Sequence, residues 1–259
     1  MEYQNIIVTE EEKIVLITIN RPKALNALNQ GVLNELEHFF QKEADSKKID
    51  GVIITGSGDR AFVAGADIKE FLELDLEKAT SMCQKVHNIY FSIEQFPKPV
   101  IAAVNGFALG GGCELAMACH LRIAGANAKF GQPEVNLGIL PGYGGTQRLV
   151  QLIGKGKALE LMMTTDMVSA DEAVSLGLAN QAVEAGEEVN AAKAMIQKIA
   201  KKAPLAIGGV ISSVNAYFDK TKDGYEEEIN AFGKLSITSD FKEGASAFIE
   251  KRKAEWKGE

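Results

Sequence analysis

Two glutamates stand where a carboxylate could act as an acid or a base. Glu114 follows a run of three glycines, residues 110–112, inside an apolar segment. It reads either as an exposed side chain that compensates a helix dipole or as a catalytic carboxylate. Glu134 directly follows Pro133, which fixes the backbone and could aim the glutamate. Taken alone, Glu134 is typical of a solvated loop residue.

The glycine run lies where a strand is expected to give way to a helix. An apolar run ends at Asn105-Gly106, and the helix is expected to begin near Cys113. Unpaired N–H groups at a helix start stabilise developing negative charge, and glycine lets a ligand approach the backbone. The alternative is that these glycines only permit tight packing of strand and helix.

A second segment, residues 62–71, offers a similar junction. Gly65 stands at the turn, and Asp67 is placed to cap the following helix. Backbone N–H groups here could form half of an oxyanion hole, with Lys69 meeting a phosphate. The plainer interpretation is a capped connection with no chemical role.

The elements expected to carry these segments alternate along the chain. Residues 14–19, 51–55 and 99–104 are apolar runs without polar alternation, which is typical of strands covered on both faces. Residues 28–40 and 76–96 have helical patterns between them. Strands and helices that alternate in this way predict an α/β fold.

The pattern changes near residue 187. Four helices are expected from there on, over residues 191–203, 207–218, 226–238 and 242–257. We therefore expect a strand-rich core over residues 1–190, carrying the active site, and a helical region over residues 191–259.

Composition narrows the class of protein. The formal charge is −7 over 259 residues, which disfavours a sequence-independent grip on nucleic acid or on an anionic membrane. The apolar stretch over residues 99–119 is long enough to span a bilayer, but it carries glycines and a central glutamate. A central carboxylate costs roughly 3 kcal/mol on insertion scales, so a soluble interior is expected.

Cysteine usage and motif searches exclude other classes. Cys83, Cys113 and Cys119 form no disulfide framework and no metal spacing, so they are expected to be reduced thiols. The N-terminus shows no targeting signal, and together these features predict a cytoplasmic protein. No dinucleotide-binding, phosphate-loop, nucleophile-elbow or zinc-protease motif occurs. No metal site and no cofactor are expected.

Three motifs together resemble the crotonase superfamily, and specifically its enoyl-CoA hydratases. They are the A-G-A-D-I segment, the N-G-x-A-x-G-G-G-C-E run, and G-Q-P-E, whose Glu134 lies twenty residues after Glu114. The resemblance extends from residues 20–28 to residues 243–253. It implies that Ala66 and Gly111 form an oxyanion hole for a thioester carbonyl. It also implies that Glu114 activates water while Glu134 transfers a proton at C2.

The resemblance implies further contacts and an assembly. Residues that would bind the coenzyme A part of the substrate are Lys23, Ala64, Asp67, Ile68, Lys69, Phe232 and Lys251, the last two supplied by the same or a neighbouring subunit. The implied fold is a spiral of ββα turns followed by a helical trimerisation region. The implied assembly is a hexamer built as a dimer of trimers. One position departs from the family pattern, because His120 stands where relatives commonly carry Asp, and we expect it to be structural.

Three alternatives stay open on the sequence. An enoyl-CoA isomerase would need only one carboxylate, whereas this chain has both glutamates in their motif contexts. A non-catalytic binding protein, including one for RNA, is disfavoured by the negative charge. A scaffolding subunit would more naturally have lost a glutamate or the glycine run. The short side chains of Ala108 and Leu109 suggest short, straight acyl chains.

Overall fold

Two sheets form the centre of the molecule in the computed structural model, which describes residues 2–43 and 48–259. The six-stranded sheet has the order β1-β2-β3-β5-β7-β10. Its strands are β1 (Ile6–Glu11), β2 (Ile14–Ile19), β3 (Gly51–Gly56), β5 (Val100–Val104), β7 (Leu121–Gly125) and β10 (Gln181–Val183). The four-stranded sheet, in the order β4-β6-β8-β9, contains β4 (Ala61–Ala64), β6 (Phe107–Leu109), β8 (Lys129–Gly131) and β9 (Val168–Ser169).

From β3 to β8, successive strands alternate between these sheets. β3, β5 and β7 pair in parallel in the larger sheet, while β4, β6 and β8 pair in parallel in the smaller one. Each pair of strands is followed by a helix: α2 (Leu76–Glu94), α3 (Gly111–Ala118) or α4 (Gly145–Ile153). The chain therefore winds as repeated ββα turns, each adding one strand to both sheets.

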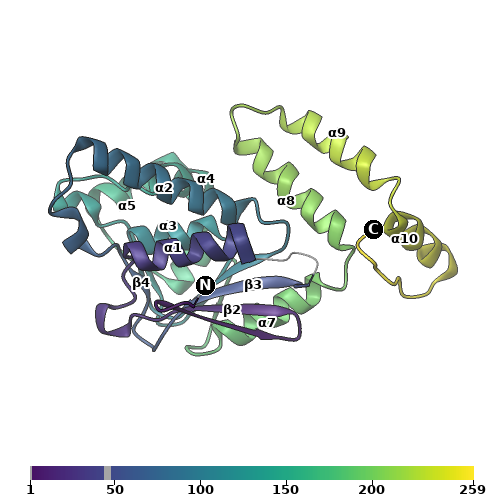
Figure 1. Cartoon of the computed structure of the whole chain (residues 1–259), viewed down its shortest axis with the longest axis horizontal. Helices are drawn as coiled ribbons and strands as arrows, with labels where there is room; N and C mark the ends of the chain where they lie inside the picture. The colour runs from purple at the N-terminus through teal and green to yellow at the C-terminus, as the bar shows by residue number, and fades with distance from the viewer. Residues whose placement is uncertain (1, 44–47) are drawn as a thin grey trace.

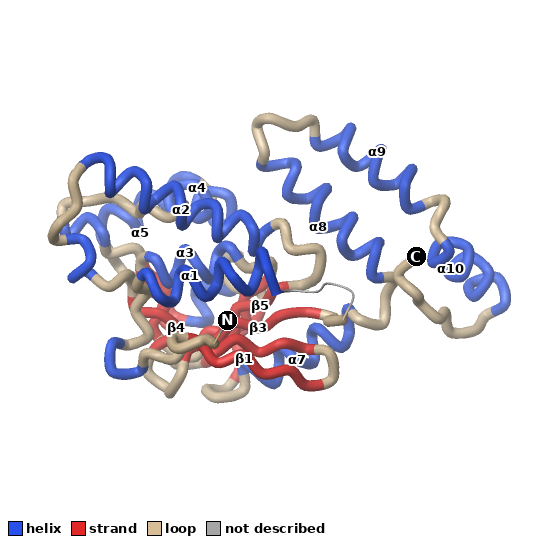
Figure 2. The backbone as a smooth tube through the Cα atoms, viewed as in Figure 1, coloured by secondary structure: helices blue, strands red, loops and turns tan. Residues whose placement is uncertain are grey.

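The larger sheet is covered on both faces, as the apolar strands predict. Along β3, Val52 and Ile54 join the main core, whereas Ile53 faces the opposite side. The main core lies under α1 (Gln30–His38), α2 and their neighbours, including α5 (Lys155–Thr164) and α6 (Ala170–Leu176). The opposite face is covered by α7 (Glu188–Ile199), seen below the sheet in Figures 1 and 2.

The remaining helices project from this core. They are α8 (Pro204–Phe218), α9 (Gly224–Leu235) and α10 (Ser239–Glu250), drawn in green to yellow in Figure 1. α8 has one fully buried residue, Ala216, and α9 has none. Because α7 packs against the larger sheet, it belongs with the core, and the projecting part begins at α8. The division at residue 190 into two folding units stays a prediction.

Short helical turns complete the architecture. They are η1 (Pro22–Ala24), η2 (Phe39–Glu43), η3 (Ile68–Phe71) and η4 (Glu134–Leu137). Asp67 caps η3 by accepting a hydrogen bond from the Lys69 N–H, as the sequence predicted. The helix after the glycine run begins at Gly111, two residues earlier than expected.

Candidate active site

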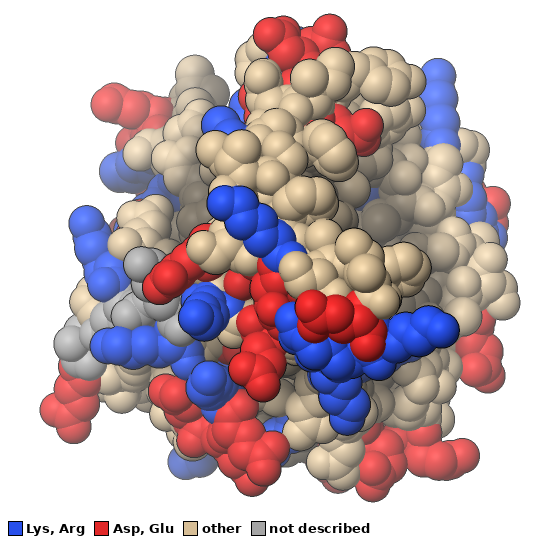
Figure 3. Space-filling model, turned by 90° about the vertical axis from the view of Figure 1, so that its right-hand side faces the viewer, with Lys and Arg blue, Asp and Glu red and all other residues tan. Residues whose placement is uncertain are grey.

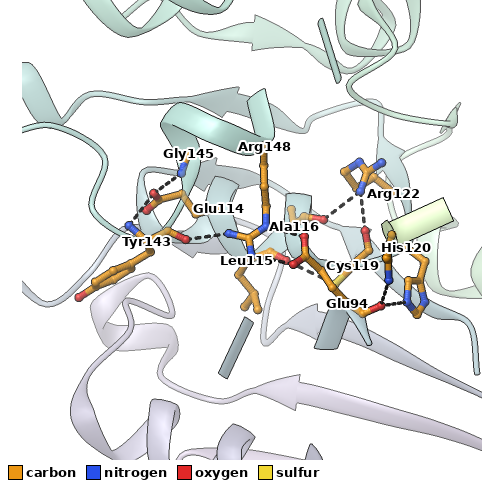
Figure 4. A network of polar contacts seen from close by, with 11 residues as sticks. Glu94, Glu114, Leu115, Ala116, Cys119, His120, Arg122, Tyr143, Gly145 and Arg148 are labelled. Atoms are coloured by element: carbon orange, nitrogen blue, oxygen red, sulfur yellow. Dashed lines mark hydrogen bonds and ion pairs between the residues drawn. The ribbon is translucent and has the colours of Figure 1, made fainter. Parts of the chain in front are cut away.

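Glu114 is anchored in the interior of the molecule. Every residue of α3 is buried, and Glu114 is only 1% exposed. Its Oε1 accepts hydrogen bonds from the backbone N–H groups of Tyr143, at 2.8 Å, and Gly145, at 2.7 Å (Figure 4). A buried carboxylate held by two backbone donors has one orientation, and its second oxygen, Oε2, is left for another partner.

The surroundings of Glu114 bring the pKa of its carboxyl group close to neutral pH. Burial raises the pKa of Glu114 to about 7, because the charged form loses its hydration. The hydrogen bond from Gly145 opposes this rise, and the nearby charge of Glu134 adds to it. A carboxyl group with a pKa near 7 can take or release a proton at physiological pH.

Glu134 approaches the glycine run from the first residue of η4. Its Oε1 lies 2.5 Å from the position that a Cβ on Gly110 would occupy, and Gly110 has a φ of 49°. Only glycine fits that position, because a side chain there would displace the carboxylate. Burial raises the pKa of Glu134 as well. The structure thus brings Glu134 to the start of the helix that carries Glu114.

Gln132 contacts the Glu134 carboxylate and was not singled out from the sequence. It is buried, and its amide nitrogen, in the orientation that satisfies its surroundings, donates to Glu134 Oε1 at 3.2 Å and Oε2 at 3.1 Å. A Cβ on Gly145 would meet both the Gln132 amide and Glu114 Oε1. The sequence shows Gln132 within the G-Q-P-E motif, but it does not show that the Gln132 side chain points toward Glu134.

Two backbone N–H groups lie near the start of α3, at the edge of the smaller sheet where β4 and β6 end. β4 pairs with β6 so that Ala64 is opposite Leu109, which places Ala66 and Gly111 just beyond the ends of neighbouring parallel strands. Within the described ranges neither the Ala66 nor the Gly111 N–H donates a hydrogen bond to the protein. Two unpaired donors at a helix start are suited to an oxygen that gains negative charge.

The segments expected to meet coenzyme A are tied together beside this edge. Arg21 forms an ion pair with Asp67 at 2.9 Å, joining the chain before η1 to η3. The hydrogen bond that Arg21 donates within this ion pair is the largest of the effects that lower the pKa of Asp67. Lys23 is exposed on η1, and Ile68 and Lys69 are exposed on η3.

Phe232 and Lys251 are not brought to this edge. Phe232 is 71% exposed on α9, and Lys251 follows α10 in a left-handed conformation. Figure 1 shows α9 and α10 projecting away from the core that contains α3. Their expected role in substrate binding stays a prediction.

No metal cluster and no membrane-crossing helix occur in the part of the chain that the structure describes. Residues 2–43 and 48–259 contain no group of three His, Cys, Asp or Glu side chains arranged to hold a metal ion. Over the same residues, the helices are too short or too polar to cross a bilayer.

Comparison with known proteins identifies the family. A profile described as enoyl-CoA hydratase/isomerase matches residues 9–259. The chain belongs to the enoyl-CoA hydratase/isomerase family. Two relatives of this family cover 98% of the chain and are covered to 98% by it. The short-chain-enoyl-CoA hydratase of Clostridium acetobutylicum is 46% identical, and the crotonyl-CoA hydratase of Syntrophomonas wolfei is 48% identical.

Solved structures of the enoyl-CoA hydratase/isomerase family share the fold. The enoyl-CoA hydratase of Bacillus anthracis superposes with a TM-score of 0.92 at 38% identity, covering 99% of this chain and 100% of its own. A second, from Geobacillus kaustophilus, reaches 0.94 at 31% identity, with coverages of 100% and 98%. The crotonase-like ββα spiral that the sequence motifs implied is therefore confirmed.

Proposed function

We propose that this chain is an enoyl-CoA hydratase that adds water reversibly across the double bond of a trans-2-enoyl-CoA to give a 3-hydroxyacyl-CoA. The observation that carries the proposal is a pair of carboxylates in unlike settings beside two unpaired backbone donors. Glu114 is anchored and buried, whereas Glu134 is half-buried on η4. Unlike environments suit the opposite roles of accepting and donating a proton.

Each group has one part in the proposed reaction. Glu114 Oε2 accepts a proton from water while the water oxygen bonds to C3 of the substrate. The electron pair of the double bond moves toward the thioester carbonyl, whose oxygen is stabilised by the Ala66 and Gly111 N–H groups. Glu134 then gives its proton to C2. Dehydration uses the same groups in reverse, and no cofactor is needed.

The paired carboxylates favour hydration over isomerisation. Moving a double bond requires one carboxylate to shuttle a proton, and a second, half-buried carboxylate would then be a desolvation cost without a role. The names of the two relatives, a short-chain-enoyl-CoA hydratase and a crotonyl-CoA hydratase, point the same way. We therefore assign short acyl chains of the crotonyl type as substrate.

The substrate's nucleotide end is assigned to the exposed side of this edge. Lys23 and Lys69 supply positive charge there, with Ala64, Asp67 and Ile68 lining the approach. Phe232 and Lys251 complete the site from a neighbouring copy in the proposed hexamer, a dimer of trimers. The proposed compartment is the cytoplasm, consistent with three free cysteines and no disulfide in the described residues.

An assembly is favoured by the surface of the projecting helices. Large apolar side chains there are 60% to 86% exposed: Val210, Tyr217, Ile229, Phe232, Phe248 and Ile249. Figure 3 shows much uncharged surface on the upper half of this end of the molecule. Apolar patches of this kind mark association surfaces.

The decisive experiment follows the ultraviolet absorbance of crotonyl-CoA, which falls as water adds to the conjugated double bond. We expect rapid loss with the unmodified protein. Glu114→Gln and Glu134→Gln should each reduce kcat by about 100-fold or more, because each removes one proton-transfer group. Loss of absorbance that survives both substitutions would overturn the assignment of these residues.

A matched control distinguishes chemistry from folding. Glu73→Gln changes an exposed glutamate outside the site and should leave kcat unchanged. An unmodified protein that leaves crotonyl-CoA intact but moves the double bond of a 3-enoyl-CoA would be an isomerase, and the hydratase proposal would be wrong.

A further inference from the structure

The loop that binds Glu114 has three successive peptide groups with alternating partners. The N–H of the Gly142–Tyr143 peptide donates to Glu114 Oε1, and the N–H of the Gly144–Gly145 peptide donates to the same oxygen. The peptide between them, Tyr143–Gly144, points its carbonyl the other way, where it accepts from Arg148 Nη1 at 2.9 Å (Figure 4).

Arg148 is itself fixed from two sides. Its guanidinium makes a two-pronged ion pair with Glu94 of α2, with distances of 2.7 Å from Nε and 2.9 Å from Nη2. The same guanidinium lies 5.7 Å from the ring centroid of Tyr90 and 5.5 Å from that of Phe91. Paired and stacked contacts hold this planar group in one orientation, and the side chain is buried.

The turn itself requires this anchoring. Gly144 has a φ of 104°, and a Cβ there would overlap Arg148 Nη1. The peptides on either side have partners of their own, because the Gly144 carbonyl accepts from the Gln147 and Arg148 N–H groups and Gly142 is hydrogen-bonded to His87. The central peptide, between the two donors, is held by the contact of its carbonyl with the Arg148 side chain.

We propose that Arg148, oriented by Glu94, is a positioning residue for Glu114: it fixes the central peptide of the loop so that the peptides on either side aim their N–H groups at one carboxylate oxygen. The inference rests on the proposed hydratase function, in which Glu114 accepts a proton from water. Arg148 does not touch the reacting atoms. It acts through the loop, and its own charge also favours ionised Glu114.

Other titratable groups also act on Glu114, and their side chains are kept in the variants below. Those whose charge or ionisation couples to it are Cys83 and Tyr90 on α2, Cys113 on α3, Glu134 on η4, and Tyr143 in the loop. Arg148 also contributes to lowering the pKa of His87 on α2, which hydrogen-bonds to Gly142 of the loop. The infrared titration of Glu114 described below therefore separates a shift at Glu114 from one at His87.

The test is the pH dependence of kcat/KM for crotonyl-CoA hydration in Arg148→Lys. Lysine keeps the positive charge but cannot pair with Glu94 through two nitrogens and reach the Tyr143 carbonyl as well. Looser donors stabilise the ionised carboxylate less, so its pKa rises. The acidic limb of the profile should move up by about one pH unit, equivalent to weakening one hydrogen bond to a charged group.

Arg148→Met should move the limb further in the same direction, because the nearby positive charge is lost too. Arg122→Lys is the matched control. Arg122 is also buried, but it donates to carbonyls outside the loop, those of Leu178, Ala116 and Cys119. Arg122→Lys should lower the thermal unfolding midpoint without moving the acidic limb of the pH profile. A limb that stays in place in Arg148→Lys while stability falls would overturn the positioning role.

Two further measurements make the result independent of the assay. A double-mutant cycle with Glu94→Gln and Arg148→Lys should show strongly non-additive effects on kcat/KM, since the pair acts as one unit. Infrared titration of the Glu114 carboxyl, identified by its absence in Glu114→Gln, should show the same upward shift in Arg148→Lys. If the unmodified protein fails to hydrate crotonyl-CoA, the hydratase proposal fails, while the titration still decides whether Arg148 positions Glu114.

Discussion

Glu114 combines a catalytic type of side chain with an interior setting. Two backbone N–H groups favour its ionised form, while burial disfavours that form more strongly, and the result is a pKa near 7. The protein therefore gives up stability to keep this carboxylate in place, since an exposed glutamate would ionise without penalty.

That penalty makes stability depend on pH at this residue. The folded-state pKa of Glu114, about 7, lies above its ordinary value of 4.5, so folding favours the protonated form. The destabilisation is absent below about pH 4.5, grows as the pH rises from there to about 7, and is constant at higher pH. Relative to the unmodified protein, Glu114→Gln should gain roughly 3 kcal/mol of unfolding free energy between pH 5 and pH 8. Urea unfolding at fixed protein concentration measures this difference.

The exposed Glu73 supplies the comparison for that measurement. Glu73→Gln should follow the unmodified protein at both pH values. Parallel stability curves for Glu114→Gln and the unmodified protein would show that burial of Glu114 does not couple folding to protons.

At the scale of elements, the end of α2 connects the projecting helices to the core. The Glu94 carbonyl accepts hydrogen bonds from His120 Nε2 at 2.9 Å and from Asn215 Nδ2 of α8 at 2.6 Å. His120 Nδ1 accepts from the Val100 N–H, which fixes the neutral tautomer with its proton on Nε2. Burial lowers the pKa of His120, in keeping with that form. The expected structural role of His120 is thus a link between β5 and α2.

Asn215 should therefore govern how firmly α8 is docked. Asn215→Ala removes the donor to Glu94 and should weaken the attachment by about 1 kcal/mol. Amide hydrogen exchange along α8 should accelerate severalfold. Ser212→Ala on the same helix is the control, because that hydroxyl donates to the Gly209 carbonyl within α8. Equal exchange in both variants would mean that Asn215 does not hold the helix.

At the scale of the whole molecule, the projecting helices expose apolar surface that a single copy leaves in water. Burying such surface against further copies is favourable by about 25 cal/mol per Å². A closed symmetric assembly would cover this apolar surface. It would also let α9 and α10 of one copy reach the active site of a neighbouring copy, since they do not reach the site of their own chain.

Light scattering should therefore give a mass of about 167 kDa, six copies of a 27.9 kDa chain. Phe248→Glu places a charge on an 86% exposed side chain of α10 and should lower that mass. Lys257→Glu, an exposed charge change near the same terminus, is the control and should not. A monomer mass for the unmodified protein would contradict the proposed assembly.

The sequence by itself predicted the buried strands, the helices and the family. Residues 14–19, 51–55 and 99–104 are apolar on both faces, and each proved to be a strand with a helix layer on either side. These features are visible because periodicity and local capping act over a few neighbouring residues. The shorter strands, such as β6 and β9, were missed because three or two residues carry no readable period.

Only the tertiary structure decided how the candidate site is held together. Glu114 and Gly145 lie 31 residues apart in the chain, and Arg148 and Glu94 lie 54 apart, yet each pair makes direct contact. No local pattern encodes such a contact, because it depends on where successive ββα turns place their loops. The sequence therefore determined which residue types are present, and packing decided which of them meet.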